Sequence, residues 1–152
     1  GKGDAANHLR PTSDRVRESL FSMLAGGRFG DPLTGAVVLD LFAGTGALGL
    51  EALSRGASHV TFIEKNRAAL KLLDANIRTL GAEARVLRRS TLAPGPAARP
   101  ATLLFLDPPY GMGLGEQALE AARISGWIAP GAIVDPWSAS DLPHPHPQRI
   151  LQ

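Results

Sequence analysis

The stretch that decides the fold spans residues 37–49 and reads Val37-Val38-Leu39-Asp40-Leu41-Phe42-Ala43-Gly44-Thr45-Gly46-Ala47-Leu48-Gly49. Its first five residues are apolar apart from one acid, which is typical of a strand buried on both faces of a parallel sheet. The G-x-G-x-x-G pattern that follows predicts a turn whose backbone a ligand can approach closely. We therefore predict a strand, a ligand-binding turn and a helix in direct succession.

Strands and helices alternate on both sides of this stretch. Short apolar runs predict the strands, and apolar residues at helical spacing, bounded by cap residues and glycines, predict the helices. The predicted strands are 37–41, 59–63, 85–87, 102–106 and 132–134, and the predicted helices run from the cap candidates at 12–14 to Gly26, from 47 to 55, from 67 to 80 and from 115 to 125. This alternation predicts an α/β fold with a mostly parallel, doubly wound sheet and helices on both faces.

The two ends of the chain differ from this pattern. Residues 1–11 carry little apolar content and are interpreted as a mobile leader, and residues 12–152 as one domain. Four prolines between Pro136 and Pro147 interrupt regular structure, so we expect a proline-rich tail from about residue 136. Residues 149–152 remain as a possible short strand.

Composition excludes several classes of protein. The 152 residues are 44% hydrophobic and 20% charged, which suits one globular domain, and no apolar run approaches the ~20 residues of a membrane helix. There is no cysteine and no pattern of a signal peptide. We expect a cytoplasmic protein without a membrane partner, disulfides or thiol chemistry.

Basic residues are unevenly distributed. The net charge is only +2, yet the segment 78–99 carries five arginines against the single acid Glu83: Arg78, Arg85, Arg88, Arg89 and Arg99. Arginine suits phosphate oxygens, so this segment is a candidate contact for nucleic acid. A solvated face or a codon bias toward arginine explains it equally well.

Three predicted strands end on an acid, and the carboxyl ends of parallel strands meet at one edge of a sheet. We therefore expect Asp40, Glu64 and Asp107 to face one crevice. Glu64 stands twenty residues after Gly44, where a carboxylate can accept hydrogen bonds from the hydroxyls of a ribose.

The glycine pattern alone fits NAD, FAD or S-adenosylmethionine, or a loop that merely needs glycine. The charge of Asp40 would repel a pyrophosphate and attract an ammonium or sulfonium group, which favours S-adenosylmethionine.

A second motif, Asp107-Pro108-Pro109-Tyr110, follows the strand 102–106. Two prolines hold the backbone extended, so the Pro108 carbonyl is free to accept a hydrogen bond beside the Asp107 carboxylate. Two fixed acceptors suit an exocyclic amino group, and Tyr110 offers a face on which a base can stack. A strand followed by a polar turn without a binding role is the less favoured alternative.

Three segments carry a family resemblance: RPTSDRVRESLFSML from Arg10, DLFAGTGALGLEALSRGA from Asp40 and LDPPYG from Leu106. Together they resemble the class I S-adenosylmethionine-dependent methyltransferases, and among these the bacterial 16S ribosomal RNA guanine-N2 methyltransferases of the RsmD type. The resemblance implies a Rossmann-like sheet, S-adenosylmethionine as methyl donor and a guanine amino nitrogen as acceptor. It also implies that Arg10 and Thr12 help hold the methionyl end of the cofactor.

The residues and the resemblance together define the expected site. The catalytic residues are Asp107, Pro108, Pro109 and Tyr110. The cofactor-binding residues are Arg10, Thr12, Asp40, Phe42, Ala43, Gly44, Thr45, Gly46, Glu64, Lys65 and Asn66. No metal is expected, and the expected partner of the monomeric enzyme is 16S rRNA or an assembling small ribosomal subunit.

Three other functions remain open at this level. An adenine-N6 or cytosine-N4 methyltransferase could use the same Asp107–Tyr110 motif, because those bases also present amino groups. A NAD-binding oxidoreductase could use the same glycine turn. A non-catalytic RNA-binding module would bind RNA whether or not Asp107 is present.

Overall fold

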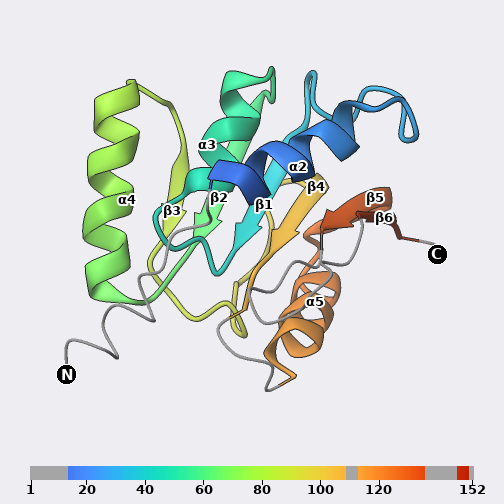
Figure 1. Ribbon diagram of the computed structural model, residues 1–152. Helices are drawn as coiled ribbons and strands as arrows, with labels where there is room; N and C mark the ends of the chain where they lie inside the picture. Colours follow the sequence, from blue (N-terminus) through green and yellow to red (C-terminus); the bar gives the residue numbers. More distant parts are fainter. Residues whose placement is uncertain (1–13, 109–112, 136–146, 151–152) are drawn as a thin grey trace.

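The computed structural model describes residues 14–108, 113–135 and 147–150 (Figure 1). In these residues the helices are α2 (Asp14–Ala25), α3 (Ala47–Ser54), α4 (Arg67–Leu80) and α5 (Leu114–Ile124). The strands are β1 (Val37–Leu41), β2 (His59–Ile63), β3 (Arg85–Leu87), β4 (Ala101–Leu106), β5 (Ile128–Asp135) and β6 (Gln148–Arg149). They form one sheet in the order β3-β2-β1-β4-β5-β6.

The sheet is parallel from β3 to β5, and β6 runs antiparallel to β5. In this order β1 lies between β2 and β4. The chain adds β2 and β3 on one side of β1 and then β4 and β5 on the other, so the strand order reverses at β1 and its glycine turn. The arrowheads of β1, β2 and β4 point to the same edge, the lower one in Figure 1. The predicted α/β class, with a mostly parallel sheet, is confirmed.

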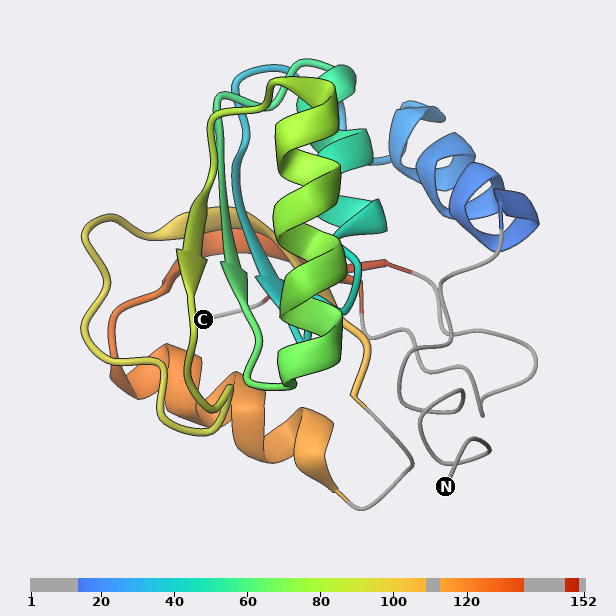
Figure 2. The same cartoon turned by 90° about the vertical axis from the view of Figure 1, so that its left-hand side faces the viewer.

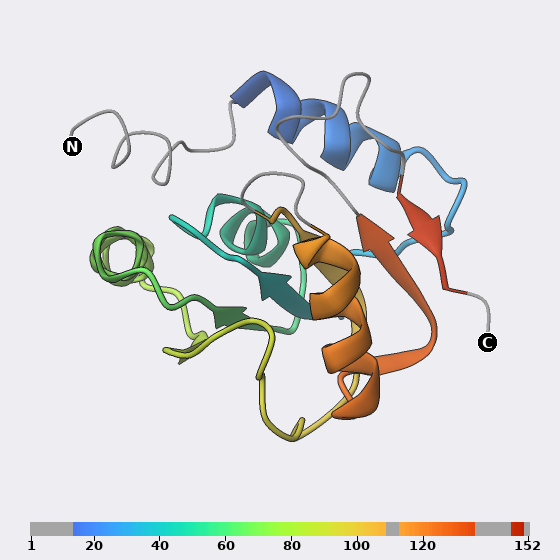
Figure 3. The ribbon, with the colours of Figure 1, turned by 90° about the horizontal axis from the view of Figure 1, so that it is seen from below.

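Helices cover both faces of this sheet (Figures 2 and 3). Residues of α2, α3 and α4 form one core with Val38, Phe62 and Phe105, while α5 and Trp127 form the other with Leu39 and Leu104. Side chains alternate between the faces of a strand, so each central strand contributes to both cores. This explains the continuously apolar runs in the sequence.

The last strands differ most from the sequence prediction. β5 begins at Ile128 rather than at residue 132, and it contains Pro130 and Gly131, which normally argue against a strand. A shift in register accommodates them, because Ala101 pairs with Ile128 whereas Leu103 pairs with Ile133. β6 is two residues long and begins one residue earlier than expected. The predicted leader, and most of the predicted tail at 136–146, lie outside the described residues.

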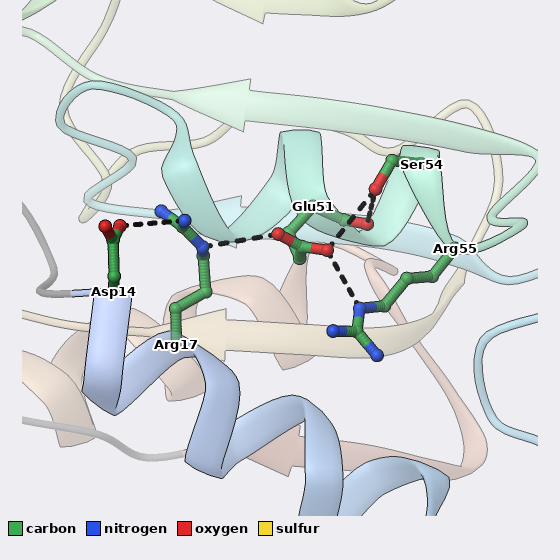
Figure 4. Close-up of polar contacts among 5 residues, drawn as sticks. All are labelled: Asp14, Arg17, Glu51, Ser54 and Arg55. Carbon is green, nitrogen blue, oxygen red and sulfur yellow. Dashed lines mark hydrogen bonds and ion pairs between the residues drawn. The ribbon is translucent and has the colours of Figure 1, made fainter.

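A chain of ion pairs holds the beginning of α2 against α3 (Figure 4). The Arg17 guanidinium lies 2.8 Å from Asp14 Oδ1 and 3.2 Å from Glu51 Oε1. Glu51 Oε2 in turn accepts hydrogen bonds from Arg55 Nε at 2.9 Å and Ser54 Oγ at 3.4 Å. Exposed ion pairs contribute little to stability, so the half-buried Arg17–Glu51 pair links α2 to α3 in addition to the apolar residues that α2 buries.

Within the described ranges, every helix is too short or too polar to cross a bilayer.

Candidate functional site

The turn between β1 and α3 is built from left-handed backbone. Phe42, Gly44 and Gly46 have φ angles of 58°, 59° and 83°. A positive φ is costly for a residue with a side chain, so Phe42 is a strained position of the kind that gathers at functional sites. Two hydrogen bonds hold the turn against β2 and α4. Ala43 N donates to Ile63 O at 3.1 Å, and Asn76 Nδ2 donates to Thr45 O at 2.9 Å. The contribution of Asn76, from α4, was not predicted from the sequence.

The three glycines of the motif have different surroundings. A Cβ on Gly44 would meet nothing closer than Phe42 O at 4.0 Å, so the space beside this residue is open to a ligand. A Cβ on Gly46 would overlap the Leu73 side chain, and one on Gly49 would overlap the Phe62 ring. The first glycine therefore leaves access for a ligand, the second lets the turn lie close to α4, and the third lets α3 pack closely on β2.

Asp40 holds the start of α3 in place through a hydrogen bond. Its Oδ2 accepts a hydrogen bond from Gly49 N at 3.0 Å, and the side chain is only 3% exposed. The residue that caps α3, Gly46, has no side chain to accept from the first turn, so Asp40 supplies an acceptor that the helix otherwise lacks.

Burial raises the pKa of Asp40 well above its usual value, although the hydrogen bond from Gly49 lowers it. The negative charges of Asp107 and Glu64 raise the pKa of Asp40 further. Asp40 pairs with Phe62 and Phe105, which stand two residues before Glu64 and Asp107, so the three acids lie at the same edge of the sheet. The structure therefore places these acids at one edge of the sheet, while a shared crevice stays a prediction.

Glu64 links the tip of β2 to the turn. Its Oε1 accepts from Gly44 N at 2.8 Å, and its Oε2 accepts from Lys65 N at 3.1 Å and Asn66 N at 2.9 Å. A carboxylate offers about four acceptor sites, so one of them remains on Oε1 after these three bonds. Lys65 and Asn66 thus contact Glu64 through their backbone N–H groups, while the Asn66 side chain caps α4 by accepting from Ala69 N at 2.9 Å.

Asp107 and Pro108 directly follow β4 and are both half-buried. Because β4 pairs with β1, they lie at the same edge of the sheet as Asp40. The predicted site residues Pro109, Tyr110, Arg10 and Thr12 lie outside the described residues.

A fourth acid, Asp135, ends β5 and was missed in the sequence. It pairs with Phe105, which in turn pairs with Asp40, so Asp135 and Asp40 point to the same face of the sheet. Its side chain is 1% exposed, and within the described part of the structure Oδ2 has no hydrogen-bond partner. Burial raises its pKa to about 7. The sequence could have predicted this residue, because its strand, like the other three, ends on an acid.

Among the described residues, no three His, Cys, Asp or Glu side chains gather in a way that could hold a metal ion.

Comparison with known proteins identifies the family. A family model described as conserved hypothetical protein 95 matches residues 2–146. The ribosomal RNA small subunit methyltransferase D of Haemophilus influenzae is 38% identical over 141 residues, which are 89% of this chain and 70% of that protein. The chain belongs to the RsmD-type methyltransferase family. Its relative of the same name in Escherichia coli K12 is 43% identical over 128 residues, and the match spans 83% of this chain but only 62% of that protein.

Solved structures agree with the assignment to the RsmD-type family. The yhhF protein of Escherichia coli is 44% identical, with a TM-score of 0.70 over 83% of this chain and 68% of that one. A Thermus thermophilus 16S rRNA N2 G1207 methyltransferase, solved with AdoMet and guanosine, is 24% identical, with a TM-score of 0.65 over 82% of this chain and 34% of that one. This second likeness bears on the fold alone, which is the Rossmann-like fold of class I methyltransferases.

Proposed function

We propose that this protein transfers a methyl group from S-adenosylmethionine to the exocyclic N2 amino group of a guanine in small-subunit ribosomal RNA. The names of the related RsmD proteins support ribosomal RNA as the substrate. The observation that carries the proposal is the position of Asp107, which directly follows β4 where that strand pairs with β1, the strand that leads into the glycine turn. An acceptor for an amino group thus lies beside a turn suited to an adenosine cofactor.

The residues of the turn fit S-adenosylmethionine. The open space beside Gly44 allows close approach to the backbone, and the remaining acceptor site on Glu64 Oε1 suits a ribose hydroxyl. Asp40, which accepts a hydrogen bond from Gly49 N and is almost fully buried, holds the backbone of the turn in place rather than contacting the ligand itself. Arg10 and Thr12 remain our proposed contacts to the methionyl end. The cofactor supplies a methyl group already activated by its positively charged sulfur.

The end of β4 would orient the acceptor nitrogen. The lone pair of a guanine amino group is delocalised into the ring, so the nitrogen is a weak nucleophile. If the Asp107 carboxylate and the Pro108 carbonyl each accept one amino N–H, they fix the nitrogen in one orientation and favour localisation of its lone pair. The nitrogen that gains a methyl group must lose one proton, and Asp107 is the acceptor beside it. Tyr110 is our proposed stacking surface for the base.

The test is transfer of tritiated methyl from S-adenosylmethionine to 16S rRNA and to small-subunit particles from a strain that lacks this enzyme. Digestion to nucleosides identifies the product. We expect N2-methylguanosine. N6-methyladenosine or N4-methylcytidine would reassign the base, and binding of RNA without any transfer would contradict an enzymatic function.

A further inference from the structure

A groove with basic walls opens next to the glycine turn. It has a volume of about 520 Å³ and lies between the start of α4 and the end of β3. Its lining residues are Lys65, Arg67, Leu70, Lys71, Asp74 and Arg88. Lys65 directly follows Glu64, so the groove adjoins the residue that we expect to face the cofactor ribose.

Most of the positive charge in this groove is not neutralised. Arg88 is paired with the single acid of the groove, because its Nη2 lies 2.7 Å from Asp74 Oδ1. The exposed side chains of Lys65, Arg67 and Lys71 form no ion pair with any described residue. The groove therefore offers three exposed cations to an anionic partner.

One of these cations stands at a position that is unfavourable for the helix itself. Arg67 is the first residue of α4, and the first turn contains no acid. The N-terminus of a helix carries a partial positive charge, so a cation there lowers helix stability. A bound anion would offset this cost.

The arginines of segment 78–99 are divided between two edges of the sheet. Arg85 begins β3 and Arg99 precedes β4, and their charges add to burial in lowering the pKa of His59 at the start of β2. Arg78 lies in the last turn of α4, at the same amino-terminal edge, the upper one in Figure 1. Of this segment, only Arg88 lines the groove at the carboxyl edge. The cations that line the groove are therefore mostly Lys65, Arg67 and Lys71, which lie outside the segment 78–99.

We propose that this groove binds the sugar–phosphate backbone of the ribosomal RNA that flanks the target nucleotide, an inference that rests on the function proposed above. Regularly spaced phosphates match a row of exposed cations, and such contacts position an RNA without reading its sequence. The lining residues include no aromatic ring on which a base could stack, which favours phosphate over base contacts.

The test compares two double variants that remove the same charge. Arg67→Gln with Lys71→Gln removes two cations of the groove, and Arg78→Gln with Arg85→Gln removes two from the opposite edge. For the groove variant we expect a KM for 16S rRNA or particles that rises at least several-fold, with kcat and the KM for the cofactor unchanged. The dependence of RNA affinity on salt becomes less steep by about 1.4 in the log–log slope, or 0.7 per lost contact. The opposite-edge variant keeps the wild-type values.

Two further measurements make the outcome decisive. Thermal unfolding checks the fold, and we expect the Tm of the groove variant to be unchanged or raised, because a cation leaves the helix N-terminus. The variant Arg67→Lys with Lys71→Arg keeps the charges and should keep the wild-type KM.

A wild-type KM and salt dependence for the Gln groove variant, or equal losses of RNA affinity in both Gln variants, would overturn the groove proposal. If the wild type transfers no methyl to any RNA, the function proposal fails, whereas the salt dependence of RNA binding still tests the groove.

Discussion

Individual carboxylates at the carboxyl edge of the sheet differ in what surrounds them. Glu64 accepts three backbone N–H groups, Asp40 accepts one and is buried, and Asp135 leaves one oxygen without a partner among the described residues. Asp107 remains half-buried at the end of β4. These differences in burial and bonding assign different roles to acids that are indistinguishable in the sequence.

Replacing Asp107 tests its role in the reaction. Asp107→Asn keeps the size of the side chain but replaces one acceptor oxygen with an NH₂ donor. The side chain is then less able to accept a hydrogen bond from the amino group of the base and to take up its proton. We expect kcat for methylation of 16S rRNA to fall by about 10²- to 10³-fold, the range found for loss of one orienting hydrogen bond. Cofactor affinity by calorimetry and the Tm should stay at wild-type values. A variant that methylates RNA at the normal rate would show that Asp107 does not hold the amino group.

Asp135 makes stability depend on pH. Its pKa is raised from 3.8 to about 7, so the folded protein keeps a proton on this group that the unfolded chain loses. The stabilisation is fully present below about pH 4 and is lost as pH rises to about 7. The loss amounts to at most about 4 kcal/mol of unfolding free energy.

Asp135→Asn is neutral throughout this range. We expect it to unfold at a higher temperature than the wild type at pH 8, with the difference shrinking toward pH 4. The buried Asp40 is present in both proteins, so its own titration does not produce the difference. Glu83→Gln, at an exposed acid between α4 and β3, is the matched control and should follow the wild type. Parallel pH profiles for Asp135→Asn and the wild type would disprove the role of Asp135.

At the scale of the elements, the glycine turn depends on packing between α3 and β2. Several elements were predicted within a residue from periodicity and caps, among them β1, β2 and α4, because their own residues determine them. The contacts that shape the turn were not predictable in this way. The hydrogen bonds that Gly49 N donates to Asp40 and that Asn76 donates to Thr45 O join residues nine and thirty-one positions apart. Only the assembled fold brings these residues together.

Gly49→Ala tests this packing. A Cβ at this position would overlap Phe62 and approach Val60 Cγ1 to 2.9 Å, and both side chains are fully buried. The substitution favours an isolated helix, yet overpacking of a tight core typically costs about 1–3 kcal/mol. We expect a lower Tm and a smaller free energy of unfolding in urea. Ala47→Gly, in the first turn of the same helix, serves as a comparison that adds no atom and loses only helix propensity. A gain in stability for Gly49→Ala would mean that α3 moves freely on the sheet.

At the scale of the whole molecule, the sheet separates two edges that carry different groups. The amino-terminal edge carries Arg85 and Arg99 around His59, and the carboxyl edge carries the acids, the glycine turn and the basic groove. Sequence proximity grouped the arginines of 78–99 together, but after α4 ends at Leu80, β3 carries the chain to the carboxyl edge and the segment 88–100 returns it to the start of β4. Charge counts along a sequence therefore predicted the presence of a basic surface and not its position.

Cofactor binding should stabilise the whole fold, because the turn joins β1, β2, α3 and α4 through bonds of Gly44, Gly49 and Asn76. A ligand that binds only the folded state adds about 2.7 kcal/mol at a concentration one hundred times its Kd, which raises the Tm. We expect S-adenosylmethionine to produce this shift, and NAD to produce none. Glu64→Gln keeps the size of the side chain but loses acceptor sites, so it should weaken the shift. Asp40→Ala should weaken it as well, at a further cost in stability without ligand. A Tm that rises with NAD and not with S-adenosylmethionine would instead support an oxidoreductase, because the glycine turn alone is compatible with both cofactors.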